Sequence, residues 1–224
     1  MRLIFAIVLC ATQVFAEDSC EYGGRVWSYV VNEDGSIRIT GANPSDGIWE
    51  VPASLDGRSV STVSGYSKDI SGLIVPEGVE HIWGFEGCGN LRTVILPESI
   101  SDISGLAFRG CSIERFVAPS NHVRVGAWAF ERCTNFRDIE VGTWFFDCLN
   151  QEDISGYKNG QCLRNQCITN CVVKGSAGEC FIKRETFSGC TFLESVEFRG
   201  SSVVLSNGVF KDCSALHSIN WVAD

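Results

Sequence analysis

The chain has 224 residues, 45% of them hydrophobic and 20% charged, so it is long enough for a buried core and its composition excludes intrinsic disorder as the main state. Eighteen Lys and Arg against 27 Asp and Glu give a net charge of −9, which disfavours a nucleic-acid binder because such a protein needs a basic face to neutralise phosphates. Twelve cysteines indicate an oxidising compartment without separating disulfides from packed thiols.

The first 16 residues have the pattern of a secretory signal peptide. Arg2 precedes a short apolar run from Leu3 to Ala11, and the small residue Ala16 stands before Glu17. The run is too short to span a bilayer, and no later segment is long and apolar enough to do so. We therefore predict residues 1–16 to be a signal peptide and the protein to be secreted without membrane insertion, with association to a cell surface left open.

Residues 17–63 are predicted to form an N-terminal β cap and a first, incomplete coil. Asp34-Gly35 lies between alternating apolar residues, a pattern that predicts the turn of a β-hairpin. We expect this hairpin to shield the open edge of the neighbouring coil.

From residue 64 to 224, side-chain types return about every 23 residues. The motif Phe-x-x-Cys carries the repeat, and apolar residues follow each cysteine at fixed offsets, as Leu91, Val94 and Leu96 follow Cys88. One interval is longer and predicts an insertion near 149–161. The predicted core positions are Phe85, Phe108, Phe130, Phe187 and Phe210, with Cys88, Cys111, Cys133, Cys167, Cys190 and Cys213.

Each repeat has the properties of one coil of a solenoid. Val94 and Leu96 fall on one face of a short strand and Ile95 on the other, and Pro97 ends the pairing because it has no N–H to donate. No single unit buries its apolar face alone, whereas stacked units share one core. We predict a mainly β solenoid with parallel strands, about six to seven coils, short helical turns at the Phe-x-x-Cys corners and the N-terminal hairpin as a cap.

The repeat pattern resembles the BspA-like class of leucine-rich repeat. The head resembles that class too, through Trp27-Ser-Tyr29, the segment around Asp34-Gly35, and Val51-Pro52. This resemblance implies a secreted or cell-surface recognition role, often adhesion, and provides no catalytic residues to transfer. The insertion and the shortened first units depart from the pattern.

The cysteines divide into two sets. Those in the repeat slots are expected to point into the core as small hydrophobic side chains, and we favour packed thiols over disulfides there. The candidates for disulfides lie near the insertion, where one pair would close the insertion loop and a second would follow it; connectivity stays open. These candidates are Cys148 with Cys162 and Cys171 with Cys180. A metal site formed by the same cysteines is the rival interpretation, but the close paired spacing of zinc sites is missing, so we predict none.

Outward positions of the strands form the candidate binding surface. They carry charges of both signs, which either satisfy one another on adjacent coils or present a mixed-charge face to a protein partner. The residues predicted for this surface are Arg92, Arg115, Arg137, Asp138, Glu140, Lys174, Glu194 and Glu197. Cys171 and Lys174 are placed among these outward columns.

Three tryptophans offer a different ligand class. Trp83, Trp128 and Trp144 are candidates for an exposed aromatic platform that stacks on sugars, although packing beneath a loop is the commoner role of such residues. The three histidines, His81, His122 and His217, fall at outward repeat positions without a nucleophile motif beside them. We therefore predict no catalytic residues and no cofactor.

The sequence thus favours a secreted, non-catalytic recognition or adhesion protein that binds an extracellular protein through the solenoid face. A carbohydrate-binding module that uses the tryptophans is one alternative. A structural, disulfide-stapled extracellular protein without a specific ligand is the other.

Overall fold

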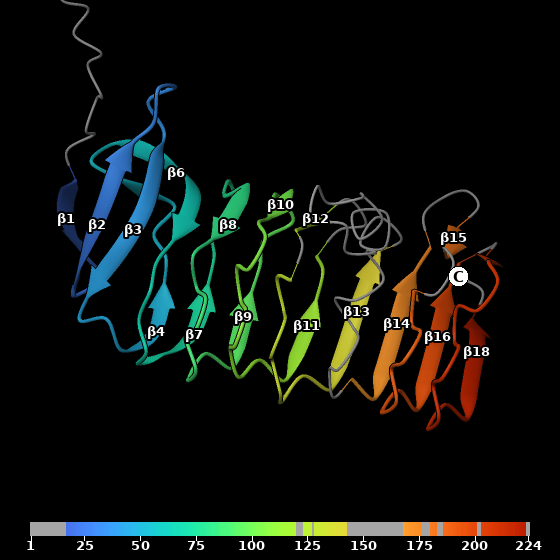
Figure 1. The fold of residues 1–224 in the computed structure, drawn as a ribbon. Helices are drawn as coiled ribbons and strands as arrows, with labels where there is room; N and C mark the ends of the chain where they lie inside the picture. Colours follow the sequence, from blue (N-terminus) through green and yellow to red (C-terminus); the bar gives the residue numbers. More distant parts are fainter. Residues whose placement is uncertain are drawn as a thin grey trace, which may run out of the picture.

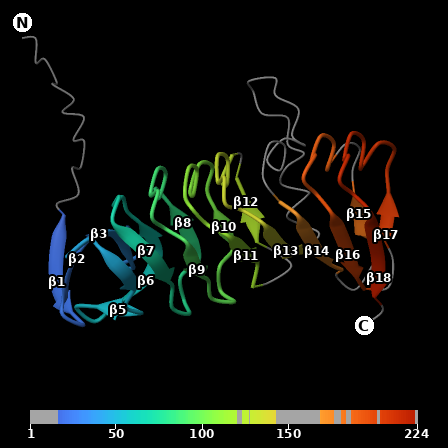
Figure 2. The same ribbon diagram turned by 90° about the horizontal axis from the view of Figure 1, so that it is seen from below.

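The computed structural model describes residues 17–119, 123–126, 128–142, 168–175, 180–182, 186–200 and 203–222. The predicted signal peptide and most of the predicted insertion lie outside these residues. Within them the chain forms stacked coils with strands on two sides and no helix (Figures 1 and 2). The mainly β solenoid predicted from the repeat is therefore confirmed.

One side of the coils carries eight strands, which we call the front strands. They are β4 (Gly47–Glu50), β7 (Ile70–Ile74), β9 (Thr93–Ile95), β11 (Arg115–Val117), β13 (Asp138–Gly142), β14 (Asn170–Lys174), β16 (Ser195–Arg199) and β18 (Ser218–Val222). They form a three-stranded sheet, β4-β7-β9, and a five-stranded sheet, β11-β13-β14-β16-β18. All pairs in both sheets are parallel, as stacked coils require.

The other side carries the back strands. They are β6 (Arg58–Ser64), β8 (His81–Trp83), β10 (Asp102–Ile103), β12 (Arg124–Val125), β15 (Cys180–Ile182) and β17 (Val203–Leu205). The first four pair in parallel in the order β6-β8-β10-β12, and β15 pairs in parallel with β17. The short strand β5 (Ser54–Leu55) pairs with β6 in the antiparallel sense.

The N-terminal cap is formed by three strands, β1 (Asp18–Tyr22), β2 (Arg25–Val31) and β3 (Ile37–Asn43). They pair as two consecutive antiparallel hairpins. The predicted turn at Asp34-Gly35 is present: Asn32 N–H donates to the Ser36 carbonyl at 2.8 Å, and Gly35 has φ 83°, which favours glycine. Strand β3 then pairs in parallel with β6, so the hairpin covers the edge of the first back strand as predicted.

The inward side chains of the five-stranded front sheet align in rows. One row, numbered along the solenoid, is Phe116, Ile139, Cys171, Val196 and Ile219. The first four of these side chains are buried and Ile219 is partly buried. Equivalent residues of successive repeats therefore occupy one shared core, which is the physical content of the repeat.

The register predicted for β14 is wrong by two residues. The repeat predicts Val173 in the row of Ile139 and Val196, but Cys171 occupies that row and Val173 pairs with Val141 and Phe198. Cys171 therefore points into the core with 1% of its surface exposed, and the outward position predicted for it is incorrect. A shift of two residues keeps every side chain on its original face, so the apolar pattern did not distinguish the two registers.

The Phe-x-x-Cys corners stack into an aromatic ladder. Starting from Trp27 of the cap, ring centroids follow one another at 5.8 Å to Trp49, 6.1 Å to Phe85, 6.0 Å to Phe108 and 5.6 Å to Phe130. Phe187 and Phe210 stack in the same way at 5.3 Å. The corners are turns rather than the predicted short helices, and each closes through a bond such as Cys88 N–H to the Phe85 carbonyl at 3.2 Å.

The corner cysteines are hydrogen-bond donors as well as core side chains. Cys111 Sγ donates to the Phe85 carbonyl of the preceding coil at 3.2 Å, Cys133 Sγ to the Phe108 carbonyl at 3.1 Å, and Cys213 Sγ to the Phe187 carbonyl at 2.9 Å. A small apolar side chain with a weak donor therefore both fills the core and satisfies a carbonyl oxygen. Burial raises the pKa of the Cys133 thiol to about 11, so this cysteine is protonated at neutral pH.

Candidate binding surfaces

The front strands expose two outward rows of side chains, which together make up the front face. In one row Arg115, Asp138, Asn170, Ser195 and Ser218 are aligned by strand pairing, and in the other Val117, Glu140, Val172, Glu197 and Asn220. The predicted alignment of Arg115 with Asp138, and of Glu140 with Glu197, is thus correct in register. Arg92, Arg137 and Glu194 are exposed just before their strands.

Lys174 occupies a different row from the one predicted. It pairs with Gly142 and Arg199 rather than standing between Glu140 and Glu197, because the β14 register is shifted by two residues. Its ammonium still reaches Glu140, at 3.3 Å between Nζ and Oε1. Position along the strand changed while the partner predicted by charge was kept.

Glu140 is the centre of a cluster of charges on the front face. Besides Lys174, its carboxylate lies 3.6 Å from Arg115 Nη2 and 3.7 Å from Arg199 Nη1, and the side chain of Glu140 is only 18% exposed. Arg199 Nε also lies 2.5 Å from Glu197 Oε1. The charges of neighbouring coils therefore neutralise one another here, and Arg92 forms a similar pair with Glu114 at 3.0 Å.

Next to these charges lies an exposed aliphatic area, which we call the apolar patch and define as Ile48, Ile74, Ile95 and Val117. Ile48 is 54% exposed, Ile95 51% and Val117 38%, and Ile74 is partly buried. Ile74 and Ile95 pair directly across β7 and β9, and β11 is the next strand along the same side (Figure 1). The patch is contiguous on the outer surface of the sheet, where folding does not require apolar side chains.

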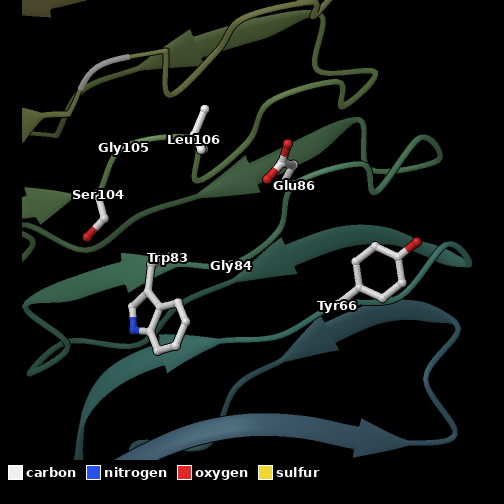
Figure 3. A pocket seen from close by; sticks show the side chains of 7 residues that line it. All are labelled: Tyr66, Trp83, Gly84, Glu86, Ser104, Gly105 and Leu106. Atoms are coloured by element: carbon white, nitrogen blue, oxygen red, sulfur yellow. The ribbon is translucent and has the colours of Figure 1, made fainter. Parts of the chain in front are cut away.

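A hollow of about 840 Å³ opens on the other side of the coils (Figure 3). Its lining residues follow the back strands β6, β8 and β10 on three successive coils. They are Tyr66, Trp83, Gly84, Glu86, Ser104, Gly105 and Leu106. Trp83 is 41% exposed and Tyr66 58%, so two aromatic rings face solvent at one place.

The hollow exists because one coil is shorter than the next. Ile82 of β8 pairs with Ile103 of β10, so Trp83 and Ser104 are equivalent positions. Only Gly84 separates Trp83 from Phe85, whereas three residues separate Ser104 from Phe108. The missing two residues leave a recess beside the longer turn that carries Leu106.

Of the three tryptophans proposed as a sugar platform, the structure brings only Trp83 to the hollow. Trp128 is partly buried in the turn that is equivalent to that of Leu106, one coil further along, and Trp144 lies outside the described residues. Both turn residues have positive φ, 63° for Leu106 and 57° for Trp128.

Among the candidate disulfide cysteines, only Cys171 has a described side chain. It is a free, buried thiol, which disagrees with the predicted pair of Cys171 and Cys180, because the β14 register turns its side chain into the core. Burial raises the pKa of this thiol strongly. Cys148, Cys162 and the slot residue Cys167 lie outside the described residues.

No group of three or more His, Cys, Asp or Glu side chains capable of holding a metal ion occurs within the described ranges. The described part of the chain likewise contains no helix that is long and apolar enough to cross a membrane. His81 and His217 stand at exposed positions, and His122 lies outside the described residues.

Sequence reasoning missed three contributions to these surfaces. Ile48 and Ile74 precede the regular repeats, so no column of outward residues included them. Tyr66 and Glu86 gave no signal by residue type, although the deletion of two residues before Phe85 was visible. The residues after the corner phenylalanines, Glu86, Arg109 and Glu131, alternate in charge on adjacent coils, and this column could have been found by the same counting.

The fold and the exposed strand rows define a class: a repeat scaffold in which each coil contacts its neighbours and presents outward positions for binding. Comparison with known protein families matches residues 64–172 and 142–223 to six copies of the BspA type leucine rich repeat region. The chain belongs to this family, as its resemblance to the repeat pattern predicted.

Solved structures agree on the fold. The leucine rich repeat protein TpLRR of T. pallidum is 21% identical, with 85% of this chain and 88% of that chain covered and a TM-score of 0.57. A leucine rich cell surface protein of Faecalibacterium prausnitzii is 14% identical, with coverages of 93% and 96% and a TM-score of 0.32. A leucine-rich repeat protein of Bacteroides ovatus is 15% identical, with coverages of 88% and 75% and a TM-score of 0.36. No curated protein matches the chain.

Proposed function

We propose that this protein is a secreted, non-catalytic recognition and adhesion protein that binds an extracellular protein partner through its front face. Membership of a leucine-rich-repeat family supports the class of function, because a repeat scaffold offers an extended surface of outward side chains. The secretory pattern of residues 1–16 and the abundance of cysteine support an extracellular location.

The apolar patch is the observation that carries the choice of a protein partner. Ile95 and Val117 occupy outward strand positions where later coils have Glu140, Glu197 and Asn220, so the fold does not require aliphatic side chains there. Exposing them to water is unfavourable unless a partner covers them. Aliphatic side chains surrounded by charged groups are typical of the centre and rim of a protein interface.

The rim of the patch is already organised by ion pairs. Arg92 with Glu114, and Arg115 with Glu140, hold long side chains beside Ile95 and Val117 at distances of 3.0 and 3.6 Å. A partner therefore meets charged groups whose positions are partly fixed, which reduces the entropy lost on binding. Because both signs of charge are present, the surface fits a protein of mixed charge better than a polyanion.

Binding to immobilised collagen, laminin and fibronectin tests the proposal. The substitution Val117→Asp places a charge in the apolar patch and is expected to weaken binding about tenfold or more. The matched control is Val204→Asp on the back strand β17, because Val204 is 39% exposed and Val117 38%. The control variant is expected to bind like the wild type.

Two results would overturn this assignment. Equal losses in Val117→Asp and Val204→Asp would show that added charge, not the front face, matters. Absence of binding to every matrix protein in the panel would favour a structural role without a specific protein ligand. Melting temperatures of both variants, measured alongside, separate lost binding from lost folding.

A further inference from the structure

The hollow between Tyr66 and Trp83 has features that the proposed protein-binding face does not explain. It lies after the back strands, on the opposite side of the coils from the apolar patch. Trp83 and Tyr66 keep 41% and 58% of their surfaces exposed, whereas Trp27 and Trp49 are almost fully buried. Large aromatic side chains gathered in an exposed recess are a common feature of ligand sites.

The Trp83 ring is held in place from the cap. The guanidinium of Arg38, on β3, lies over this ring at 5.3 Å from its centroid. On the opposite flank, the Tyr66 ring lies beside the corner glycine Gly87, where a Cβ atom added to the glycine would be 3.8 Å from Tyr66 Cε2. Two aromatic surfaces from different coils thereby border the same space (Figure 3).

The charges around the hollow cancel. Glu86, in its lining, lies 2.8 Å from Arg109, and Arg109 also lies 2.6 Å from Glu131. With Arg38 over Trp83, two carboxylates face two guanidinium groups. No Lys or Arg is among the lining residues, so nothing in the lining recruits an anion, and the carboxylate of Glu86 already has a cationic partner.

The remaining polar groups suit hydroxyl ligands. The Ser104 hydroxyl donates to Asp102 Oδ2 at 3.0 Å and therefore offers its lone pairs to a donor. The carboxylate of Glu86 accepts further hydrogen bonds beside its contact with Arg109, and the Tyr66 hydroxyl both donates and accepts. Aromatic rings next to hydrogen-bond acceptors, without net charge, match a ring that has one apolar face and hydroxyl groups at its edge.

We propose that this hollow is a binding site for a neutral sugar ring of an oligosaccharide. Trp83 and Tyr66 contact the apolar faces of the sugar, and Glu86 and Ser104 accept hydrogen bonds from its hydroxyl groups. The site is independent of the front face, so the protein carries two binding surfaces on opposite sides of the coils. It narrows the tryptophan hypothesis from three residues to Trp83 and adds Tyr66.

Isothermal titration with cellopentaose, mannopentaose and chitopentaose tests the site. We expect at least one of these neutral oligosaccharides to bind, with an affinity that Trp83→Ala lowers about tenfold or more, since one aromatic contact contributes about 0.5–1.5 kcal/mol and 1.4 kcal/mol is tenfold. Tyr66→Ala is expected to weaken binding in the same direction, and Trp83→Phe, which keeps an aromatic face, to weaken it less.

The matched control is Trp221→Ala. Trp221 is 59% exposed but lies on β18, a front strand, so its loss is expected to leave sugar affinity unchanged. Because the proposed ligand is neutral, affinity is also expected to change less than about twofold between low salt and 1 M NaCl.

A second experiment separates a free polysaccharide from a protein-linked glycan as the source of the sugar. Ribonuclease B, which carries a neutral mannose-rich glycan, is compared with unglycosylated ribonuclease A. Binding to ribonuclease B alone assigns the glycan on a protein, and binding to free oligosaccharides alone assigns a polysaccharide.

Three results would overturn the proposal: no binding by any of these sugars, equal binding by Trp83→Ala and the wild type, or measurable and equal binding of both ribonucleases. None of them bears on the Val117→Asp experiment, so failure of the sugar site and failure of the protein-binding face are distinguishable.

Discussion

The middle coils and the last described coil share one sequence motif but differ in burial. Phe108 is fully buried between Phe85 and Phe130, whereas Phe210 is only partly buried and stacks on Phe187. The local geometry is nevertheless the same, because Cys213 closes its corner and donates to the preceding coil as Cys133 does. The motif therefore specifies the turn, and neighbouring coils on both sides provide the burial that stabilises it.

The largest expected effect of this difference is on the free energy of unfolding. Phe108→Ala removes a side chain that contacts rings on both sides, and it is expected to destabilise the protein by about 3–5 kcal/mol. Denaturant unfolding followed by circular dichroism measures the change. An unchanged midpoint would contradict the place of Phe108 in the aromatic ladder.

The matched substitution in the last coil sharpens the same prediction. Phe210→Ala is expected to cost roughly half as much, about 2 kcal/mol, because part of the ring already contacts solvent. Equal losses at Phe108 and Phe210 would show that the ladder is stabilised by local turn formation rather than by stacking.

The repeat period made the coils, the corners and the inward rows predictable. Leu91, Leu193 and Leu216 all donate to the cysteine carbonyl three residues earlier, so equivalent positions have equivalent backbone geometry. The period did not fix the coil after the long interval. There a shift by two residues preserved the apolar face of β14, and only pairing with Ile139 and Val196 selected Cys171 for the core.

The candidate sites were less predictable than the fold. Arg115 and Glu140 were identified because outward columns follow from the period, but the apolar patch includes Ile48 from β4, which has no repeat motif. The hollow depends on a missing turn, and its shape is set by what surrounds the deletion, namely Tyr66 and Leu106. Contacts between segments of unlike sequence are not contained in any one repeat.

Thiol ionisation tests the difference in burial at alkaline pH. The pKa of Cys133 is raised to about 11 by burial, above its value in the unfolded chain, so its stabilising contribution is complete below pH 9 and is lost as pH rises toward 11. We expect the difference in unfolding free energy between wild type and Cys133→Ala to shrink by about 1–3 kcal/mol between pH 8 and pH 11.

Cys213→Ala is the matched comparison, at the same slot in the last described coil. Burial raises the pKa of Cys213 as well, but this thiol is partly exposed, so water solvates its thiolate and the alkaline change is expected to be smaller. Identical pH profiles for the two variants would mean that burial does not differ between these coils.

The smallest effect concerns charges that follow the corner phenylalanines. Arg109 lies 2.8 Å from Glu86 of the preceding coil and 2.6 Å from Glu131 of the next, and its side chain is 28% exposed. Lys211 holds the same position after Phe210 and is exposed. Arg109→Gln breaks two ion pairs and is expected to lower the unfolding free energy by about 0.5–1 kcal/mol, against about zero for Lys211→Gln. The loss at Arg109 is expected to fall in 1 M NaCl, because salt screens exposed pairs; a loss that is unchanged by salt would assign the effect to packing of the Arg109 stem between the two coils.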